Sequence, residues 1–268
     1  DRNRVARVRT ELIIFDCDGV LVDSELISAR VQAKALNAAG VDIDEALLRS
    51  RFTGIPYREM YRIIEAEPGI RLPDSLDAAV SAAIRASYDR ELKEIPGVEA
   101  AVRGLSLPRC VASSAAPDKL RHGLKVTGLW HLFAPHVFSA SMVARGKPAP
   151  DLFLHAAKEM RAAPVATIVI EDSVAGVTAG VRAGMTVIGF CGGSHCDATT
   201  ADALKAAGAD VVVASMRDLG DAVRTASRCK RRRRREVTAR GGGSCRGRVP
   251  ASRSWVRVRR RGPSWRHV

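Results

Sequence analysis

The sequence predicts an α/β protein with a doubly wound parallel sheet and an inserted all-helical segment. Three observations lead to this prediction. Short apolar runs typical of strands alternate with segments of helical periodicity. Runs such as "TIVI" and "VVV" are apolar on both faces, which predicts central strands of a sheet covered on both sides. Between residues 25 and 95 the strand-like runs disappear, and only helical periodicity remains.

The strand-like runs follow one another along the chain with helical segments or loops between them. They are "ELIIFD" (11–16), "RCVASS" (109–114), "HVFSA" (136–140), "TIVIED" (167–172), "MTVIGF" (185–190) and "ADVVVA" (209–214). Pro117 followed by Asp118, and Pro150 followed by Asp151, mark two of the intervening helix starts. This order predicts a Rossmann-like core.

The chain divides into three parts by composition. Residues 1–24 and 96–225 form the predicted α/β core, and residues 25–95 form a helical cap inserted into it. Residues 226–268 are an Arg-rich, low-complexity tail. A cleft is expected between the cap and the core.

The net charge of +14 and the pI near 10.2 would suggest a nucleic-acid or membrane partner if the charge were spread over the fold. All of the excess lies in residues 226–268, which carry a net charge of +15, whereas residues 1–225 carry −1. The Gly, Ser and Pro content of this tail predicts disorder. One interpretation is a polybasic arm for nucleic acid, in which Trp255 and Trp265 stack on bases. The favoured interpretation is a shifted reading frame or cloning remnant, because the composition changes abruptly near Cys229. We therefore expect no nucleic-acid partner except through the tail.

The cysteines and the N-terminal residues indicate in which cellular compartment the protein is expected. The six cysteines contain no CxxC pair, so a disulfide framework is not expected. The polar start "DRNRVARVRT" does not resemble a signal peptide, and no apolar stretch approaches the roughly 20 residues of a membrane helix. We expect a cytoplasmic protein without a membrane partner, and a monomer.

The stretch "CGGSHC" brings Cys191 and Cys196 near His195. No fourth ligand is spaced to complete a tetrahedral metal site. We interpret this stretch as a loop that follows a strand.

Polar residues sit where the predicted strands end. They are Asp16 and Asp18, Ser113 and Ser114, Lys147 in "GKPAPD", and Glu171 and Asp172. The carboxyl ends of parallel strands meet at one edge of a sheet, where open α/β proteins bind ligands. Buried carboxylates without a counter-charge cost several kcal/mol or become protonated, so a cation should meet them. Four acids and one lysine at one crevice predict a divalent cation beside an anionic group, most simply Mg²⁺ and phosphate. Hard oxygen ligands favour Mg²⁺ over zinc.

These residues resemble the four motifs of the haloacid dehalogenase superfamily of aspartate-nucleophile phosphohydrolases. "FDCDGVLVDSE" is similar to the first motif, Ser113 to the second, Lys147 in "GKPAPD" to the third, and "IEDSVAGVTAGVRAGM" to the fourth. The resemblance runs from about residue 11 to about residue 225, and the helical insert lies where members with a cap carry it. Within the superfamily, the chain looks like the β-phosphoglucomutase and phosphoglycolate phosphatase branch. "RFTGIPYREMYRIIE" and "FLHAAKEM" resemble the sugar-phosphate phosphatases related to 6-phosphogluconate phosphatase.

The resemblance implies roles for the acidic residues. Asp16 would be the nucleophile that forms an aspartyl-phosphate. Asp18 would protonate the leaving alcohol and afterwards activate water. Mg²⁺ would be held by Asp16, the backbone carbonyl of Asp18, and Asp172, with Glu171 in the coordination sphere or just outside it.

The resemblance also implies how the phosphoryl group is bound. Lys147 and the Ser113 hydroxyl would hold its oxygen atoms. Ser114 would lie next to the substrate, and Gly19 would let the backbone turn sharply beneath the phosphate.

The expected substrate is a small phosphorylated metabolite, with sugar phosphates as the favoured class. Asp18 argues against a dehalogenase, because dehalogenases of this superfamily lack the second aspartate. Related mutases carry a histidine in the first cap helix, where this chain has Ser28, so hydrolysis is favoured and a sugar-phosphate mutase is the alternative.

Specificity is expected to reside in the cap. Thr53 and Gly54 are expected to face the cleft. Arg58 could fork onto a carboxylate or a second phosphate, or it could begin an amphipathic helix and face solvent.

Overall fold

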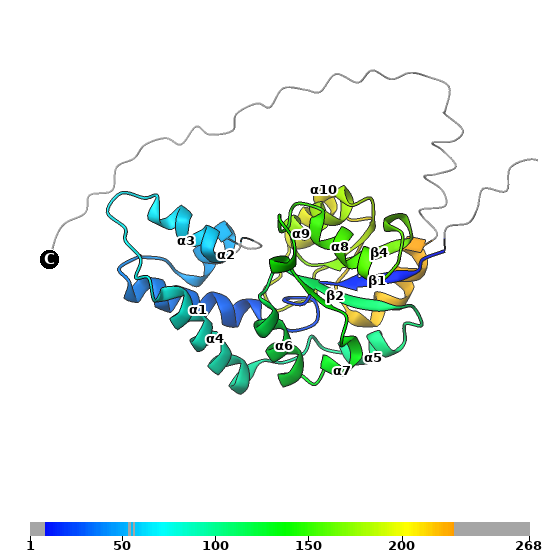
Figure 1. The fold of residues 1–268 in the computed structure, drawn as a ribbon, viewed down its shortest axis with the longest axis horizontal. Coiled ribbons are helices and arrows are strands. Elements are labelled where there is room, and N and C mark those ends of the chain that lie inside the picture. The colour runs from blue at the N-terminus through cyan, green and yellow to red at the C-terminus, as the bar shows by residue number, and fades with distance from the viewer. Residues whose placement is uncertain (1–8, 53–54, 56, 228–268) are drawn as a thin grey trace, which may run out of the picture.

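A computed structural model describes residues 9–52, 55 and 57–227 (Figure 1). Thr53 and Gly54, and nearly all of the predicted basic tail, lie outside the described residues. The predicted disorder of the tail and its alternative role in nucleic-acid binding therefore stay predictions. Within the described segments, no helix combines the length and the apolar character needed to cross a bilayer.

The described part of the core is built on a sheet of six strands, all of them parallel, in the order β3-β2-β1-β4-β5-β6. The strands are β1 (Leu12–Phe15), β2 (Arg109–Ser113), β3 (Val137–Ser139), β4 (Thr167–Glu171), β5 (Thr186–Phe190) and β6 (Val211–Val213). Each predicted strand-like run contains one of them, which confirms the predicted fold class. The run "VVV", predicted as a central strand, instead forms the half-buried edge strand β6. The strand order reverses direction between β1 and β4, so the carboxyl end of β1 lies at the switch point where such sheets bind ligands.

Helices cover both faces of the sheet (Figure 1). One face carries α5 (Val98–Arg103), α6 (Pro117–Val126) and α7 (Trp130–Phe133), and the other carries α8 (Asp151–Glu159), α9 (Val174–Arg182) and α10 (Thr200–Ala207). Short 3₁₀ helices, η1 (Ala140–Met142), η2 (Pro164–Ala166) and η3 (Met216–Asp218), lie in the connections. The predicted helix starts are found, because Pro117 is the first residue of α6 and Pro150 is the N-cap of α8.

The alternation of side chains along β1 shows why both faces must be covered. Ile13 and Phe15 pack into one hydrophobic cluster, whereas Leu12 and Ile14 pack into the other, and all four are fully buried. Successive strand residues point to opposite faces, so a strand without polar residues is stable only between two helical layers. Each such side chain contributes about 1.5–3 kcal/mol of burial free energy. The buried side chains of β1 therefore fix the backbone position of Asp16, the next residue.

Among the described residues between β1 and α5 there are four helices: α1 (Glu25–Ala38), α2 (Glu45–Phe52), α3 (Tyr57–Glu65) and α4 (Leu76–Glu91). We call α1–α4 the helical insert. It forms the left lobe in Figure 1, where α1 packs against α2 and α4, and α4 reaches α6 of the core. Leu36, Met60, Val80 and Ile84 are buried within it. The insert therefore has apolar contacts of its own beside the carboxyl end of the sheet.

Candidate active site

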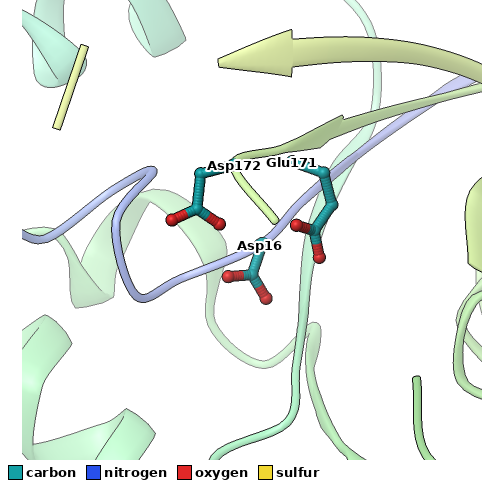
Figure 2. Close-up of side chains that lie close together, drawn as sticks. All are labelled: Asp16, Glu171 and Asp172. Carbon is teal, nitrogen blue, oxygen red and sulfur yellow. The ribbon is translucent and has the colours of Figure 1, made fainter. Parts of the chain in front are cut away.

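Three carboxylates meet at the carboxyl ends of β1 and β4. Asp16 directly follows β1, and its backbone N–H donates to the Ile170 carbonyl at 3.0 Å, which continues the ladder with β4. Glu171 ends β4, and Asp172 is the next residue. Figure 2 shows the three side chains close together, with their carboxyl groups on the same side. They are 6%, 1% and 8% exposed, respectively, so their charges are almost fully removed from water.

Lys147 supplies the cation that this cluster requires. Its Nζ donates to Asp16 Oδ1 and to Glu171 Oε1, both at 2.6 Å, and to the Ala112 carbonyl at 3.1 Å. An ammonium group has three protons, and all three therefore have acceptors. Burial lowers the pKa of Lys147, but the two carboxylates outweigh burial and raise it. Lys147 is thus a fixed positive charge in this site.

The cluster still contains more negative than positive charge. Burial raises the pKa of Asp16 well above its usual value; Lys147 opposes this, and Glu171 and Asp172 add to it. Carboxylate oxygen atoms of the three acids all lie within 4.8 Å of one another. Buried, mutually repelling oxygen ligands at this spacing fit a hard divalent cation such as Mg²⁺, which would neutralise them. The residues that are present therefore fit the predicted metal.

Asp18 contacts a different set of groups. Its Oδ1 accepts from Ser24 Oγ at 2.5 Å and from Tyr88 Oη at 3.4 Å, and it lies 3.3 Å from Lys119 Nζ. Burial raises the pKa of Asp18, but Lys119 and the hydrogen bond from Ser24 outweigh burial and lower it. Its side chain does not belong to the three-carboxylate group, so of the four predicted metal residues only Asp16, Glu171 and Asp172 bring their carboxylates together.

Sequence reasoning missed Lys119 and Tyr88. Lys119 lies in the first turn of α6, where a cation is unfavourable with respect to the helix dipole, and this was an available signal. Tyr88 lies in the apolar pattern of α4 and carried no such signal.

The contact of His195 with Asp172 was not predicted either. The stretch from Cys191 to Cys196 is a loop after β5, as expected, but the His195 ring reaches Asp172, with Nε2 2.9 Å from Oδ2. Burial lowers the pKa of His195, but hydrogen bonds to Asp172 and Cys196 outweigh burial and raise it to about 11. His195 therefore adds positive charge to the site. Its place after a core strand, at the same edge as the acids, was the available signal.

Gly19 packs closely against the side chain of Asp172. Its φ is +76°, and a Cβ built on it would lie 1.9 Å from Asp172 Oδ2 and 2.8 Å from His195 Cε1. Both the backbone conformation and the space therefore require glycine at this position.

Gly19→Ala is expected to lower the free energy of unfolding by about 1–3 kcal/mol from backbone strain, plus the cost of displacing Asp172. Urea unfolding measures this loss. Gly40→Ala is the matched control, because Gly40 has a φ of +86° and a Cβ there would meet no described atom within 4 Å. Equal losses in the two variants would contradict the importance of the Asp172 contact.

The predicted phosphate-binding serines border a shared cavity. Ser113 ends β2 and is buried, and its Oγ accepts from the Ala115 N–H at 3.1 Å. Ser114 follows it and is exposed. The cavity has a volume of about 590 Å³ and is lined by residues of the strand ends and of the helical insert. Asp16, Asp18, Ser113, Ser114 and Lys147 are among its lining residues.

The predicted specificity residues are only partly placed. Arg58 lines the cavity, but its side chain is 85% exposed and its Nε lies 3.5 Å from Asp77 Oδ2. It therefore sits at the rim, largely in solvent. Thr53 and Gly54 lie outside the described residues.

Comparisons with known proteins show the family to which the chain belongs. The family model described as haloacid dehalogenase-like hydrolase matches residues 10–184. The chain is 35% identical over 188 residues to 6-phosphogluconate phosphatase of Escherichia coli K12, covering 70% of this chain and 85% of that protein.

Two solved structures have the same fold. A conserved haloacid dehalogenase-like protein from Agrobacterium tumefaciens is 40% identical, with a TM-score of 0.72 over 80% of this chain and 98% of that one. A haloacid dehalogenase family hydrolase from Deinococcus radiodurans, solved with bound phosphate and sodium, is 31% identical, with a TM-score of 0.66 over 82% of this chain and 97% of that one. The predicted family and enzyme class are confirmed: the chain belongs to the haloacid dehalogenase-like hydrolases.

Proposed function

We propose that this protein is a Mg²⁺-dependent phosphatase that hydrolyses small phosphorylated metabolites, with sugar phosphates as the favoured class. The observation that carries the proposal is the contact of Lys147 with both Asp16 and Glu171 at the edge of an open cavity. This arrangement offers an anionic nucleophile beside a fixed cation, whose charge attracts phosphoryl oxygens and whose protons would pass from the carboxylates to them. The similarity to 6-phosphogluconate phosphatase supports the substrate class.

In the first half-reaction, an oxygen of Asp16 attacks the phosphorus and the bond to the ester oxygen breaks. Asp18 must enter this step protonated, although Lys119 and Ser24 lower its pKa. It gives its proton to the leaving oxygen, so that an alcohol departs and an aspartyl-phosphate remains on Asp16. Lys147 and the Ser113 hydroxyl hold the phosphoryl oxygens while charge spreads over them. Lys147 also opposes protonation of Asp16, because it lies 2.6 Å from Oδ1.

In the second half-reaction, Asp18 takes a proton from water, and the water oxygen attacks the phosphorus. The bond between phosphorus and Asp16 then breaks, which releases inorganic phosphate and restores both carboxyl groups. The same residue thus acts as acid and then as base.

Asp16, Glu171 and Asp172, together with the backbone carbonyl of Asp18, would hold Mg²⁺. When bound, this ion neutralises the carboxylates and the charge of the phosphoryl group. Glu171 Oε2 is oriented by the N–H and the hydroxyl of Ser173, both at 3.0 Å, so the protein fixes this carboxylate before any ligand binds.

The helical insert is proposed to be a cap domain that comprises residues 25–95. Its helices line the cavity opposite the strand ends, so they would enclose the leaving group and exclude water. Ser28 of α1 lines this cavity and lies 3.5 Å from Tyr88 Oη. A serine here offers no histidine-like acid or base for a mutase, which supports hydrolysis.

The test is a phosphate-release screen over 6-phosphogluconate, glucose 6-phosphate, phosphoglycolate and a nucleotide. We expect the fastest release from a sugar phosphate, and a loss of about 100-fold or more with EDTA, because the metal contributes several kcal/mol of transition-state stabilisation. Readdition of Mg²⁺ should restore the rate.

Release from none of these compounds, or rates that do not respond to EDTA, would contradict the proposal. NMR of the products distinguishes a phosphatase from a mutase, because a mutase converts one sugar phosphate into its isomer without forming inorganic phosphate.

A further inference from the structure

Lys119 stands out among the cavity residues because it joins the core to the helical insert. It belongs to α6, its side chain is 22% exposed, and its Nζ lies 3.3 Å from Asp18 Oδ1. The same Nζ lies 3.5 Å from Tyr57 Oη, and 5.6 Å and 5.8 Å from the ring centres of Tyr57 and Tyr88. A largely buried ammonium needs such compensation, here from one carboxylate and two aromatic faces.

The contacts of Asp18 are asymmetric. Ser24, Tyr88 and Lys119 all reach Oδ1. Within residues 9–52, 55 and 57–227, no hydrogen bond or ion pair to Oδ2 is found. Three donors on one oxygen fix the rotation of the carboxyl group, and they leave Oδ2 as the oxygen that can exchange a proton with a substrate.

We propose that Lys119 is a positioning residue that holds Asp18 with Oδ2 turned toward the leaving oxygen. This inference rests on the proposed function, and it goes beyond it by assigning a role to a residue outside the four motifs. Tyr57 and Tyr88 come from α3 and α4 of the insert, whereas Lys119 comes from the core. The orientation of the acid therefore depends on the insert packing against α6 as it does in this structure.

The leaving group distinguishes this role from a structural one. An alkoxide is a poor leaving group and needs the proton of Asp18, whereas p-nitrophenolate departs without protonation. The ratio kcat/KM reports only the steps up to departure of the leaving group, so the later attack of water does not enter it. A defect in positioning the acid must therefore lower kcat/KM for an alkyl phosphate selectively.

Lys119→Met is expected to lower kcat/KM for 6-phosphogluconate by about 10- to 100-fold, a part of the 10²–10⁴-fold that a general acid contributes. For p-nitrophenyl phosphate the loss should stay below about threefold. Lys119→Arg keeps a cation and should restore most of the rate with 6-phosphogluconate. Lys125→Met is the matched control, because Lys125 is exposed on the same helix and should leave both rates unchanged.

The double variant Asp18→Asn with Lys119→Met tests whether Lys119 acts through Asp18. It should be no slower with 6-phosphogluconate than Asp18→Asn alone, because a residue that positions an absent acid has nothing left to position. Should Lys119→Met unfold early in a thermal melt, Lys119→Gln carries the same expectation.

Parallel losses with both phosphates, or an additive loss in the double variant, would overturn the inference and leave the proposed function standing. Unchanged kcat/KM values of Lys119→Met with both phosphates would do the same. A wild-type protein that hydrolyses neither phosphate would overturn the proposed function and this inference together.

Discussion

Replacing Asp16 by Asn is expected to lower phosphate release by more than about 1,000-fold, because a carboxamide cannot act as the nucleophile. The fold should survive the change, since Lys147 keeps Glu171 and the Ala112 carbonyl as acceptors. Steady-state phosphate release measures the first effect, and urea unfolding measures the second. Mass spectrometry of acid-quenched samples should find a phosphorylated wild-type protein and an unmodified variant.

Asp118→Asn is the matched control for this prediction. Asp118 also lines the cavity, but it is exposed at the start of α6 and has no proposed role in the reaction. Its variant should keep nearly the full rate. Substantial turnover by Asp16→Asn, or an equal loss in Asp118→Asn, would exclude Asp16 as the nucleophile.

Replacing Lys147 by Met is expected to lower the free energy of unfolding by about 3–5 kcal/mol, the usual cost of removing one partner from a buried ion pair. Lys147 and Glu171 have side-chain exposures of 3% and 1%, so water cannot replace the lost cation. Asp16 and Glu171 would then face each other and Asp172 without compensation. Phosphate release should be lost as well, because no ammonium remains to hold the phosphoryl oxygens.

The effect of Mg²⁺ on the stability of Lys147→Met is a second test of this prediction. The ion binds the folded site and offsets the same carboxylates, so it should stabilise Lys147→Met more than it stabilises the wild type. Urea unfolding with and without MgCl₂ measures the difference. Lys158→Met, which removes an exposed lysine of α8, should match the wild type in both conditions. An unaltered stability of Lys147→Met, or an equal gain from Mg²⁺, would contradict the charge balance described for this site.

The arrangement of the sheet was largely predictable from the sequence. The runs that became β1, β4 and β5 are apolar on both faces, and this local pattern suits only strands between two helical layers. Asp16 and Glu171 lie at the ends of such runs, so parallel strands had to bring them to one edge. The need for a cation beside them followed from the cost of buried charge. The sequence assigned this role to Mg²⁺ and assigned Lys147 to the phosphoryl group, so the direct contact of Lys147 with both carboxylates was not predicted.

Other contacts were decided only by the tertiary structure. The hydroxyl of Tyr88 reaches Asp18 across 70 positions of the chain, and the imidazole of His195 reaches Asp172 from the loop after β5. Lys119 meets Asp18 because α6 and the loop after β1 come together in the folded core, and Tyr57 and Tyr88 of the insert pack against the same Nζ.

The periodicity of apolar residues shows which face of each strand or helix is buried, and it depends only on residues that are close in the sequence. The sequence by itself therefore determined the strands, the helices and their buried faces. The direction in which Lys119 or His195 points depends on how distant elements pack. Packing sums many small contacts between segments that no local pattern relates. For that reason the carboxylate cluster could be predicted from the sequence, whereas the groups that orient Asp18 and Asp172 could not.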